Sequence, residues 1–356
     1  MRHVLRLAER SPGTVGPNPA VGCVIVAGNG RIVGRGHTQM GGRPHAEKIA
    51  LDAAGALARD ATAYVTLEPC SDHDERTPCA QALVEAGIAR VVSAIENPDP
   101  RRSGHGHAIL RGAGVTVDVG VLAREACELN AGYILRATAK RPLVTLKIVQ
   151  SLDGRVATSS GESGYIGGER ARAYGHLMRA RHDAVLIGIE TALADDPELT
   201  CRIPGLEGRS PLRVVLDSRL RLSEWSNLAK SAAEIPTLVF SGRPAGGPLA
   251  ACGVEIVQVQ RDARGRPDIE AVLKELAARG IMRLLVEGGA SVHAAFLDRG
   301  LADRLEVFSA PAVFGGAGRP SIDALAALNL EEIPRFTRLG QRMLGPDLLE
   351  SFAASA

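Results

Sequence analysis

Two short segments of the chain carry side chains of the kind that bind transition metals. His45 and Glu47 stand at the start of an alanine-rich helical pattern, and Cys70 and Cys79 lie downstream, each directly after a proline. One imidazole and two thiolates give three nitrogen and sulfur ligands and leave one position of a tetrahedral zinc ion open, as in catalytic zinc sites. A helix start at Cys79 favours its thiolate. The pattern predicts that His45, Cys70 and Cys79 bind zinc.

Glu47 is predicted to be the acid and base of that site. A water at the open position of the metal has a pKa near neutrality, and a carboxylate that does not bind the metal must carry its protons. Taken alone, the pair is more typical of an ordinary helix start, where glutamate interacts favourably with the helix dipole. However, the order His-x-Glu, Pro-Cys and Cys matches the signature of zinc nucleobase deaminases.

The length and net charge indicate a two-domain protein with no sign of nucleic acid or membrane as its main partner. The 356 residues suggest two domains, and the net charge of +2 gives no reason to expect nucleic acid or an anionic membrane as a partner. No apolar run approaches the roughly 18 to 20 residues of a membrane helix. The N-terminus lacks the features of a signal peptide, so a cytoplasmic location is the default expectation.

The six cysteines are scattered, which does not suggest a disulfide framework in a cytoplasmic protein. Apart from Cys70 and Cys79, we interpret them as small buried hydrophobic residues: Cys23, Cys127, Cys201 and Cys252.

Strand-like and helix-like segments alternate through the first 140 residues. Strands are expected at 20–26, 31–37, 62–68, 89–96 and 115–120, and helices at 45–58, 79–88, 106–114 and 124–139. Asn29-Gly30 predicts a hairpin turn between the first two strands. In the helix at 45–58, Ala46, Ile49, Ala50 and Ala53 have the spacing of a core-facing stripe. This alternation predicts a three-layer α/β sandwich, with a domain boundary near 140.

A second alternating series follows that boundary. Strands are expected at 143–154, 184–189, 212–217, 237–241, 255–259, 283–289 and 304–311, and helices at 168–181, 268–279 and 290–299. No G-x-G-x-x-G motif follows a strand, so a Rossmann domain is not supported. Gly288-Gly289 instead ends a strand directly before a helix, a turn that suits a phosphate group.

Several motifs together resemble one family along nearly the whole chain. The segments "PNPAVGCVIV", "HAE" and "TLEPCS", with eight residues between Cys70 and Cys79, resemble the bifunctional riboflavin-biosynthesis deaminase/reductase. The resemblance implies a cytidine-deaminase-like sandwich at 1–140 and a dihydrofolate-reductase-like domain at 141–356. It implies one Zn²⁺ per deaminase domain, NADPH as the reductant, and assembly into a homo-oligomer.

The implied reactions act on a small phosphorylated pyrimidine. The deaminase would hydrolytically remove an amino group from 2,5-diamino-6-(5-phosphoribosylamino)pyrimidin-4-one, with Glu47 protonating the ring nitrogen and the leaving ammonia. The reductase would then use NADPH to convert the ribosyl group into a ribityl chain. In that second step the cofactor carries the chemistry and the protein orients the reactants.

The resemblance also assigns binding residues position by position. Cofactor contacts are implied for Val149, Tyr165, Thr191, Asp195, Ser218, Gly289, Ala290, Ser291, Val292, His293, Ala294 and Ala295. Substrate contacts are implied for Asn18, Ser163, Arg179, Leu199, Arg202 and Glu287. Asn18 is equally well explained as a turn residue before Pro19. Arginines such as Arg179 and Arg202 can grip a sugar phosphate with paired hydrogen bonds, and Lys147 also matches the family.

The chain departs from the family pattern in two places. In the loop at 71–78, "SDHDERTP", Asp72 looks inserted, a glycine and a proline are missing, and His73 and Arg76 are each displaced by one position. Near the reductase cofactor, Gly167 removes a hydroxyl that could contact the cofactor phosphates. Two alternatives therefore stay open: a reductase whose deaminase is impaired or redirected by the loop at 71–78, and a zinc-stabilised RNA-binding module.

Overall fold

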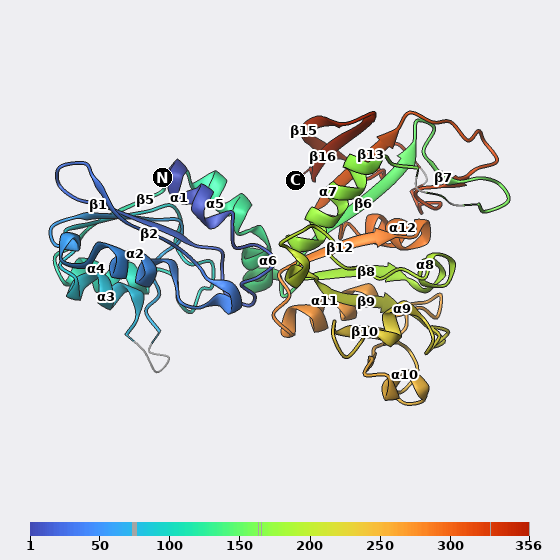
Figure 1. Cartoon of the computed structure of the whole chain (residues 1–356), viewed down its shortest axis with the longest axis horizontal. Helices are drawn as coiled ribbons and strands as arrows, with labels where there is room; N and C mark the ends of the chain where they lie inside the picture. The colour runs from blue at the N-terminus through green and yellow to red at the C-terminus, as the bar shows by residue number, and fades with distance from the viewer. Residues whose placement is uncertain (73–76, 163, 165, 328, 356) are drawn as a thin grey trace. The chain divides into compact units, whose positions relative to one another are not determined.

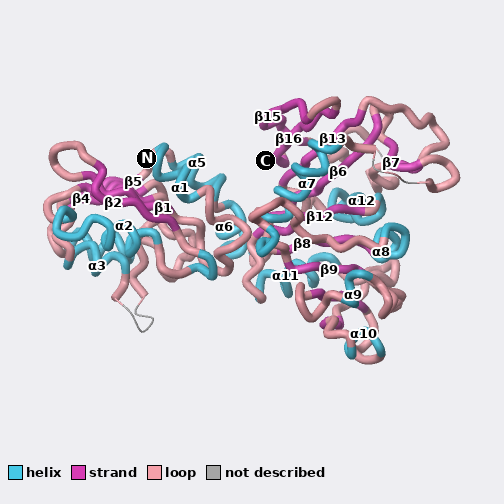
Figure 2. The backbone as a smooth tube through the Cα atoms, viewed as in Figure 1, coloured by secondary structure: helices cyan, strands magenta, loops and turns pink. Residues whose placement is uncertain are grey.

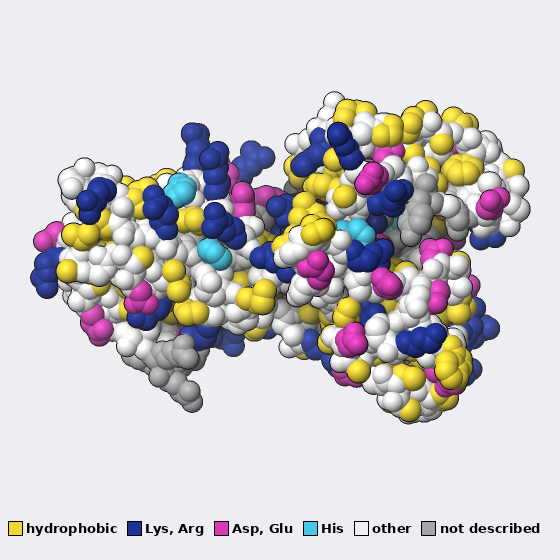
Figure 3. Space-filling view, viewed as in Figure 1, with side chains coloured by type: hydrophobic (Ala, Val, Ile, Leu, Met, Phe, Trp, Pro, Cys, Tyr) yellow, Lys and Arg dark blue, Asp and Glu magenta, His cyan; other side chains and the backbone are white. Residues whose placement is uncertain are grey.

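The computed structural model describes residues 1–72, 77–162, 164, 166–327 and 329–355. The chain folds into two compact units, Met1–Arg141 and Pro142–Ala356 (Figure 1). Among the described residues, no helix combines the length and the apolar character needed to cross a membrane. Figure 3 shows basic, acidic and hydrophobic side chains interspersed over the visible face of each unit.

The first unit is built on a five-stranded sheet in the order β2-β1-β3-β4-β5. Its strands are β1 (Gly22–Val26), β2 (Ile32–His37), β3 (Thr62–Val65), β4 (Arg90–Ser93) and β5 (Thr116–Val119). The hairpin of β1 and β2 is antiparallel, as its turn signal predicts, and β3, β4 and β5 are parallel to one another. Gly30, in the hairpin turn, has a φ of +79°, which glycine adopts without strain.

Helices cover both faces of this sheet. On one face lie α1 (Arg2–Ala8) and α5 (Ala123–Leu129), and Val4 and Leu7 of α1 pack against Val24. On the other face lie α2 (Ala46–Ala54), α3 (Cys79–Glu85) and α4 (His105–Gly112) (Figure 1). The predicted three-layer sandwich is therefore confirmed.

Close packing of α2 on β2 fixes the position of the helix that carries Glu47. A Cβ on Gly36 would lie 2.1 Å from the Ala46 carbonyl oxygen, and one on Gly34 would lie 2.1 Å from that of Ala50. Only glycine lets the helix approach the strand this closely. The "GRG" sequence in β2 thus sets the distance between sheet and helix.

The core-facing stripe of α2 differs from the predicted one. Ala46 and Ala50 are buried as expected, but Ala53 is exposed and Ile49 only half-buried. The buried face instead includes Glu47 and Ala54. Glu47 therefore points inward with the core residues, because it shares the i, i+3, i+7 spacing with Ala50 and Ala54.

The helix expected at 124–139 is two helices, α5 and α6 (Ala131–Ala139), separated at Asn130. The buried Asn130 side chain accepts a hydrogen bond from the Ala20 backbone N–H (3.0 Å) and donates one to the Ala20 carbonyl (3.1 Å). Asparagine competes in this way with regular helix hydrogen bonding. The sequence did not indicate this interruption, because the apolar pattern continues on both sides of Asn130.

The second unit is built on a nine-stranded sheet in the order β11-β10-β9-β8-β12-β6-β13-β16-β15. Its bounds are β6 (Leu143–Ser151), β8 (Ala184–Gly188), β9 (Leu212–Leu216), β10 (Thr237–Ser241), β11 (Glu255–Gln258), β12 (Arg283–Gly288), β13 (Arg304–Ala310), β15 (Phe336–Leu344) and β16 (Asp347–Ala354). The seven strands from β11 to β13 are parallel, and β16 and β15 add an antiparallel edge.

Helices cover both faces of this sheet as well (Figure 2). One face packs against α7 (Glu169–Ala180), α8 (Ile189–Asp195), α9 (Asn227–Lys230) and α10 (Pro248–Ala251). The other packs against α11 (Ile269–Ala278) and α12 (Ala290–Asp298). Alternate residues of each central strand serve the two cores, as Val185 and Leu186 of β8 illustrate.

Several elements of this unit were not expected from the sequence. They are α8, α9, α10, β15, β16 and a small ribbon of β7 (Arg155–Ala157) with β14 (Arg319–Pro320). β15 is an edge strand with most of its residues exposed, so no apolar alternation marks it. The cysteine interpretation needs a correction too: Cys127 is exposed and Cys252 only half-buried, whereas Cys23 and Cys201 are buried.

Candidate functional site

Three separate elements bring the predicted zinc ligands together in the first unit. His45 immediately precedes α2, Cys70 follows β3, and Cys79 is the first residue of α3. His45 Nδ1 lies 3.3 Å from Cys79 Sγ and 3.6 Å from Cys70 Sγ, and the three ligand atoms all lie within 4.8 Å of one another. Nitrogen and sulfur ligands of a tetrahedral zinc ion are separated by about 3.5 Å, so the donor set fits zinc.

The electrostatics of the cysteines also suit a cation. The Cys79 thiol and the His45 ring beside it lower the pKa of the Cys70 thiol to about 4. The neighbouring Cys70 sulfur and burial raise the pKa of Cys79. Two thiolates this close repel each other unless a positive charge lies between them, so a metal dication balances the pair. His45 Nε2 is buried with no partner within the described residues.

Glu47 faces the same place from the first turn of α2. Its side chain is buried, and loss of hydration raises its pKa to about 7. It lines a cavity of about 720 Å³ together with His45, Cys70 and Cys79. Burial of a carboxyl group beside metal-binding residues is the arrangement expected of a general acid and base.

Asn18 and the start of the loop at 71–78 line this cavity as well. Asn18 is half-buried, and its backbone N–H donates to the Val15 carbonyl, which closes a turn. Asn18 is therefore a turn residue that also lines the cavity. Asp72, which looks inserted by comparison with the family pattern, forms an ion pair with Arg102 at 2.9 Å. His73 and Arg76 lie outside the described residues.

Glu68, in the "TLEPC" motif, was not singled out from the sequence. Its buried carboxylate accepts hydrogen bonds from the backbone N–H groups of Asn97 (2.8 Å), Gly104 (3.0 Å), Gly106 (2.8 Å) and His107 (3.3 Å). Asn97 and the following Arg102 line the cavity. Glu68 thus holds together the part of the cavity wall that carries Asn97 and Arg102. The sequence signal for Glu68 was a glutamate at the end of an expected strand, among apolar residues.

In the second unit, the implied cofactor contacts lie at the ends of four neighbouring strands. Val149 is near the end of β6, Thr191 follows β8, Ser218 follows β9 and Gly289 follows β12. These strands are adjacent and parallel in the order β9-β8-β12-β6. Ligands of parallel sheets bind at the carboxyl ends of the strands.

The glycine turn after β12 is packed against the neighbouring strand end. A Cβ on Gly289 would lie 3.1 Å from Thr191 Oγ1, and one on Gly188 would lie 2.8 Å from Val292 Cγ2. Gly288 has a φ of +123°, a backbone conformation that favours glycine. The turn therefore brings the start of α12 and that of α8 together. Asp195, at the end of α8, is exposed.

Three of the implied reductase residues form one buried ionic cluster. Glu287 accepts two hydrogen bonds from Arg179, at 2.6 and 2.7 Å, and lies 3.1 Å from Lys147 Nζ. Gly175 of α7 leaves room for Lys147, since a Cβ there would lie 3.3 Å from its Nζ. Burial disfavours the Glu287 charge, but Lys147 and Arg179 outweigh it and hold the pKa of Glu287 well below its ordinary value.

The other implied substrate residues lie beside this cluster or outside the described part. Arg179 Nη1 donates to the Thr200 carbonyl at 3.1 Å, between Leu199 and Arg202. Leu199 is buried, and Arg202 pairs with the exposed Glu198 at 2.5 Å. Arg179 and Arg202 are thus both paired with carboxylates. Ser163 and Tyr165 lie outside the described residues.

The two sites define a two-domain enzyme that joins a zinc-dependent deaminase to a reductase. Residues 1–95 match the model of the cytidine and deoxycytidylate deaminase zinc-binding region, and residues 142–349 match that of the RibD C-terminal domain. The chain belongs to the RibD family of bifunctional riboflavin-biosynthesis enzymes.

Relatives and solved structures match along nearly the whole chain. Riboflavin biosynthesis protein RibD of Bacillus amyloliquefaciens is 39% identical, over 98% of this chain and 94% of its own length. The Aquifex aeolicus protein of the same name is 39% identical, over 99% and 97%. Acinetobacter baumannii RibD, form 1, has a TM-score of 0.91 at 35% identity, covering 100% of this chain and 98% of that one.

A second solved structure is that of an enzyme named for both reactions. It is the diaminohydroxyphosphoribosylaminopyrimidine deaminase/5-amino-6-(5-phosphoribosylamino)uracil reductase of Thermotoga maritima, with a TM-score of 0.88 at 34% identity over 100% of this chain and 97% of that one. The bifunctional enzyme is therefore favoured over the reductase alone and over an RNA-binding module. The cytidine-deaminase-like and reductase folds expected for the two halves are confirmed.

Proposed function

We propose that His45, Cys70 and Cys79 hold the zinc ion of the deaminase and that Glu47 transfers its protons. The observation that carries this proposal is the convergence of His45 Nδ1 and the two sulfur atoms in a cavity that Glu47 also lines. When bound, zinc supplies Lewis-acid activation of water. Glu47 would take the two protons of the attacking water one after the other and deliver one to the pyrimidine ring nitrogen and one to the leaving amino group.

The substrate of this first step is a phosphorylated diaminopyrimidine, and we propose that Asn18 and Asn97 help to orient it. Both residues line the cavity, whose volume of about 720 Å³ accommodates a ribosylamino pyrimidine with its phosphate. Arg43, Lys48 and Arg102 also line it and are the cations assigned to the phosphate; Lys48 is paired with Asp52 and Arg102 with Asp72.

The second step is reduction of the ribosyl group by NADPH. The turn from Gly289 to Ala295, with Val149, Thr191, Asp195 and Ser218, forms the proposed cofactor site at the strand ends, to which Tyr165 is also assigned. The amides at the start of α12 suit the pyrophosphate. The substrate is assigned to Arg179, Glu287, Leu199, Arg202 and Ser163. Lys147 and Arg179 keep Glu287 ionised, so Glu287 can accept hydrogen bonds from sugar hydroxyls.

One substitution tests the deaminase assignment. Glu47→Gln removes the acid and base without touching a metal ligand, so ammonia release should fall by roughly 100- to 10,000-fold, the loss typical for one acid-base residue. Zinc content and NADPH oxidation with the deaminated substrate should stay at the parent level. Glu125→Gln, an exposed glutamate on α5, is the matched control. Loss of zinc from Glu47→Gln would contradict the proton-transfer role.

The ligand assignment has its own test. Cys79→Ser should lower zinc content measured by atomic emission, and it should abolish ammonia release while leaving the reductase active. Cys127→Ser, at an exposed cysteine, should change neither. Full zinc occupancy in Cys79→Ser would contradict the assignment of Cys79 as a zinc ligand.

We also propose that the enzyme works as a homo-oligomer in the cytoplasm. The oligomer follows from the family, and light scattering coupled to gel filtration measures it. A reducing compartment keeps the two zinc-binding thiols and the exposed Cys127 free.

A further inference from the structure

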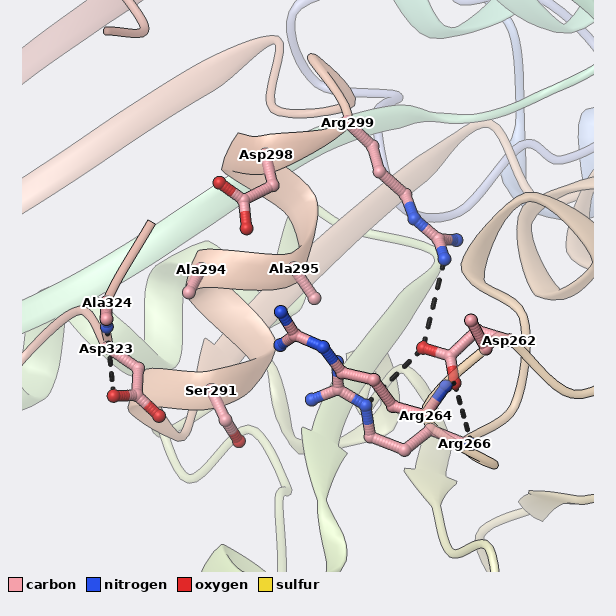
Figure 4. Close-up of a pocket in the computed structure, with 11 residues that line it drawn as sticks. Asp262, Arg264, Arg266, Ser291, Ala294, Ala295, Asp298, Arg299, Asp323 and Ala324 are labelled. Carbon is pink, nitrogen blue, oxygen red and sulfur yellow. Dashed lines mark hydrogen bonds and ion pairs between the residues drawn. The ribbon is translucent and has the colours of Figure 1, made fainter. Parts of the chain in front are cut away.

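A small pocket lies against α12, on residues that the cofactor assignment covers only in part. It has a volume of about 200 Å³ and is bounded on one side by Ser291, Ala294 and Ala295 of α12 and on the other by Arg264 and Arg266 (Figure 4). The arginines belong to the loop between β11 and α11, at the same edge of the sheet as the glycine turn.

The two arginines point into the pocket. Figure 4 shows both guanidinium groups directed from the loop toward α12, side by side. Like charges placed together are unfavourable unless an anion lies between them. Within the described part of the chain, no carboxylate pairs with Arg264, whose side chain is exposed. The pocket therefore presents positive charge that the protein itself does not fully neutralise.

The acidic residues around the pocket do not cancel this charge. Asp262 is shared: its Oδ2 lies 3.4 Å from Arg266 Nε and 3.8 Å from Arg299 Nη2, and its Oδ1 accepts the Arg264 and Arg266 backbone N–H groups. These hydrogen bonds fix the loop conformation in which both arginine side chains point into the pocket. The carboxylates of Asp298 and Asp323 also border the pocket but turn away from the guanidinium groups (Figure 4).

We infer that this pocket binds a phosphomonoester, the 2′-phosphate of NADPH, and that Arg264 and Arg266 select NADPH over NADH. The inference rests on the proposed reductase function. Arginine matches phosphate through charge-assisted, often paired hydrogen bonds, and the Ser291 hydroxyl adds a further donor. The pocket is smaller than the roughly 300 Å³ of ordinary ligand sites, which suits one phosphoryl group and part of its sugar. Its α12 wall continues from the turn assigned to the pyrophosphate.

Coenzyme preference of the full chain tests this inference. Arg264→Gln should raise the KM for NADPH by roughly 10- to 100-fold, the effect of losing charge-assisted hydrogen bonds, and change the KM for NADH less than about 2-fold. Arg266→Gln should act in the same direction. Lys274→Gln, at an exposed lysine on α11 outside the pocket, is the charge-matched control and should alter neither value.

Calorimetry separates the possible sources of the phosphate. The parent protein should bind 2′,5′-ADP more tightly than 5′-AMP, and Arg264→Gln should remove that difference. An equal loss of NADPH and NADH affinity, or no loss, would overturn the inference. So would an Arg264→Gln protein that loses affinity for inorganic phosphate yet keeps the parent KM for NADPH. A parent protein that oxidises neither coenzyme would instead refute the proposed reductase.

Discussion

Glu287 and Arg179 form a doubly hydrogen-bonded ion pair, at 2.6 and 2.7 Å, between the end of β12 and the last turn of α7. The Glu287 side chain is 8% exposed and that of Arg179 13%, so both charges are largely removed from water. Such pairs seldom add much stability relative to apolar residues, but breaking one leaves an uncompensated charge. The pair therefore fixes a site rather than simply stabilising the fold.

Glu287→Gln should lower the free energy of unfolding of the second unit by about 3 kcal/mol, because Lys147 and Arg179 are left without their counter-charge. Reductase turnover should fall with it, and ammonia release should not. Urea denaturation and NADPH oxidation measure the two effects. The control is Glu198→Gln, which breaks the exposed pair with Arg202 and should cost no more than about 1 kcal/mol. Equal effects of the two substitutions would contradict the role of burial.

Arg213 provides a second, independent prediction. It is fully buried on β9, and its guanidinium donates to the carbonyl groups of Glu198 (3.2 Å), Leu228 (3.1 Å) and Ile235 (2.7 Å). These hydrogen bonds hold the segment directly before Leu199 close to α9 and the residues that follow it. No sequence pattern distinguishes this arginine from an exposed one.

Arg213→Met should lower the free energy of unfolding by about 3 to 5 kcal/mol, because three backbone carbonyl groups lose their donor. The KM for the ribosyl substrate should rise roughly 10-fold, with a smaller change in turnover, because Arg213 orders the substrate segment without touching the reacting atoms. Arg213→Lys should rescue part of both effects. A variant with unchanged stability and a raised KM would refute the positioning role. A variant with reduced stability and an unchanged KM would refute it as well.

Local patterns predicted much of the fold, since the central strands of both units are apolar runs bounded by turn signals. The predicted zinc ligands come together because they start helices or end a strand, positions that sequence reveals. What sequence could not reveal depends on long-range contacts. Asn130 interrupts a helix through a bond to Ala20, and Glu68 gathers four N–H groups from 29 to 39 residues away. The stripe on α2 was misjudged because a glutamate lay on its buried face.

Glu68→Gln should impair the deaminase while leaving its metal in place. A glutamine amide presents one donor group where the carboxylate accepts backbone N–H groups, so at least two of these groups lose their acceptor. The wall that carries Asn97 should loosen, and the KM for the pyrimidine should rise roughly 10-fold. Ammonia release and zinc content measure this, with Glu125→Gln as control. Loss of zinc in Glu68→Gln would show that the residue supports the metal ligands instead.

His182 contributes a pH dependence to the stability of the second unit. It is buried after α7, where its Nδ1 donates to the Met178 carbonyl at 2.7 Å and its Nε2 lies 3.2 Å from Thr145 Oγ1. Burial, with Arg283 nearby, lowers the pKa of His182 to about 4, from an ordinary value of 6.5. Between these values the unfolded chain binds a proton that the folded chain does not. Stability therefore falls as the pH drops below 6.5.

His182→Asn, which keeps a donor near the Met178 carbonyl, should flatten this dependence. Between pH 6.5 and 5, the slope of the unfolding free energy should decrease by about 1.4 kcal/mol per pH unit, the effect of one proton. Glu287 interferes little, because its ordinary pKa of 4.5 lies below this pH range and its folded pKa is lower still. Urea denaturation at a series of pH values measures the slope, and His105→Asn, at an exposed histidine, should leave it unchanged. A slope that His182→Asn leaves intact would assign the acid sensitivity to another group.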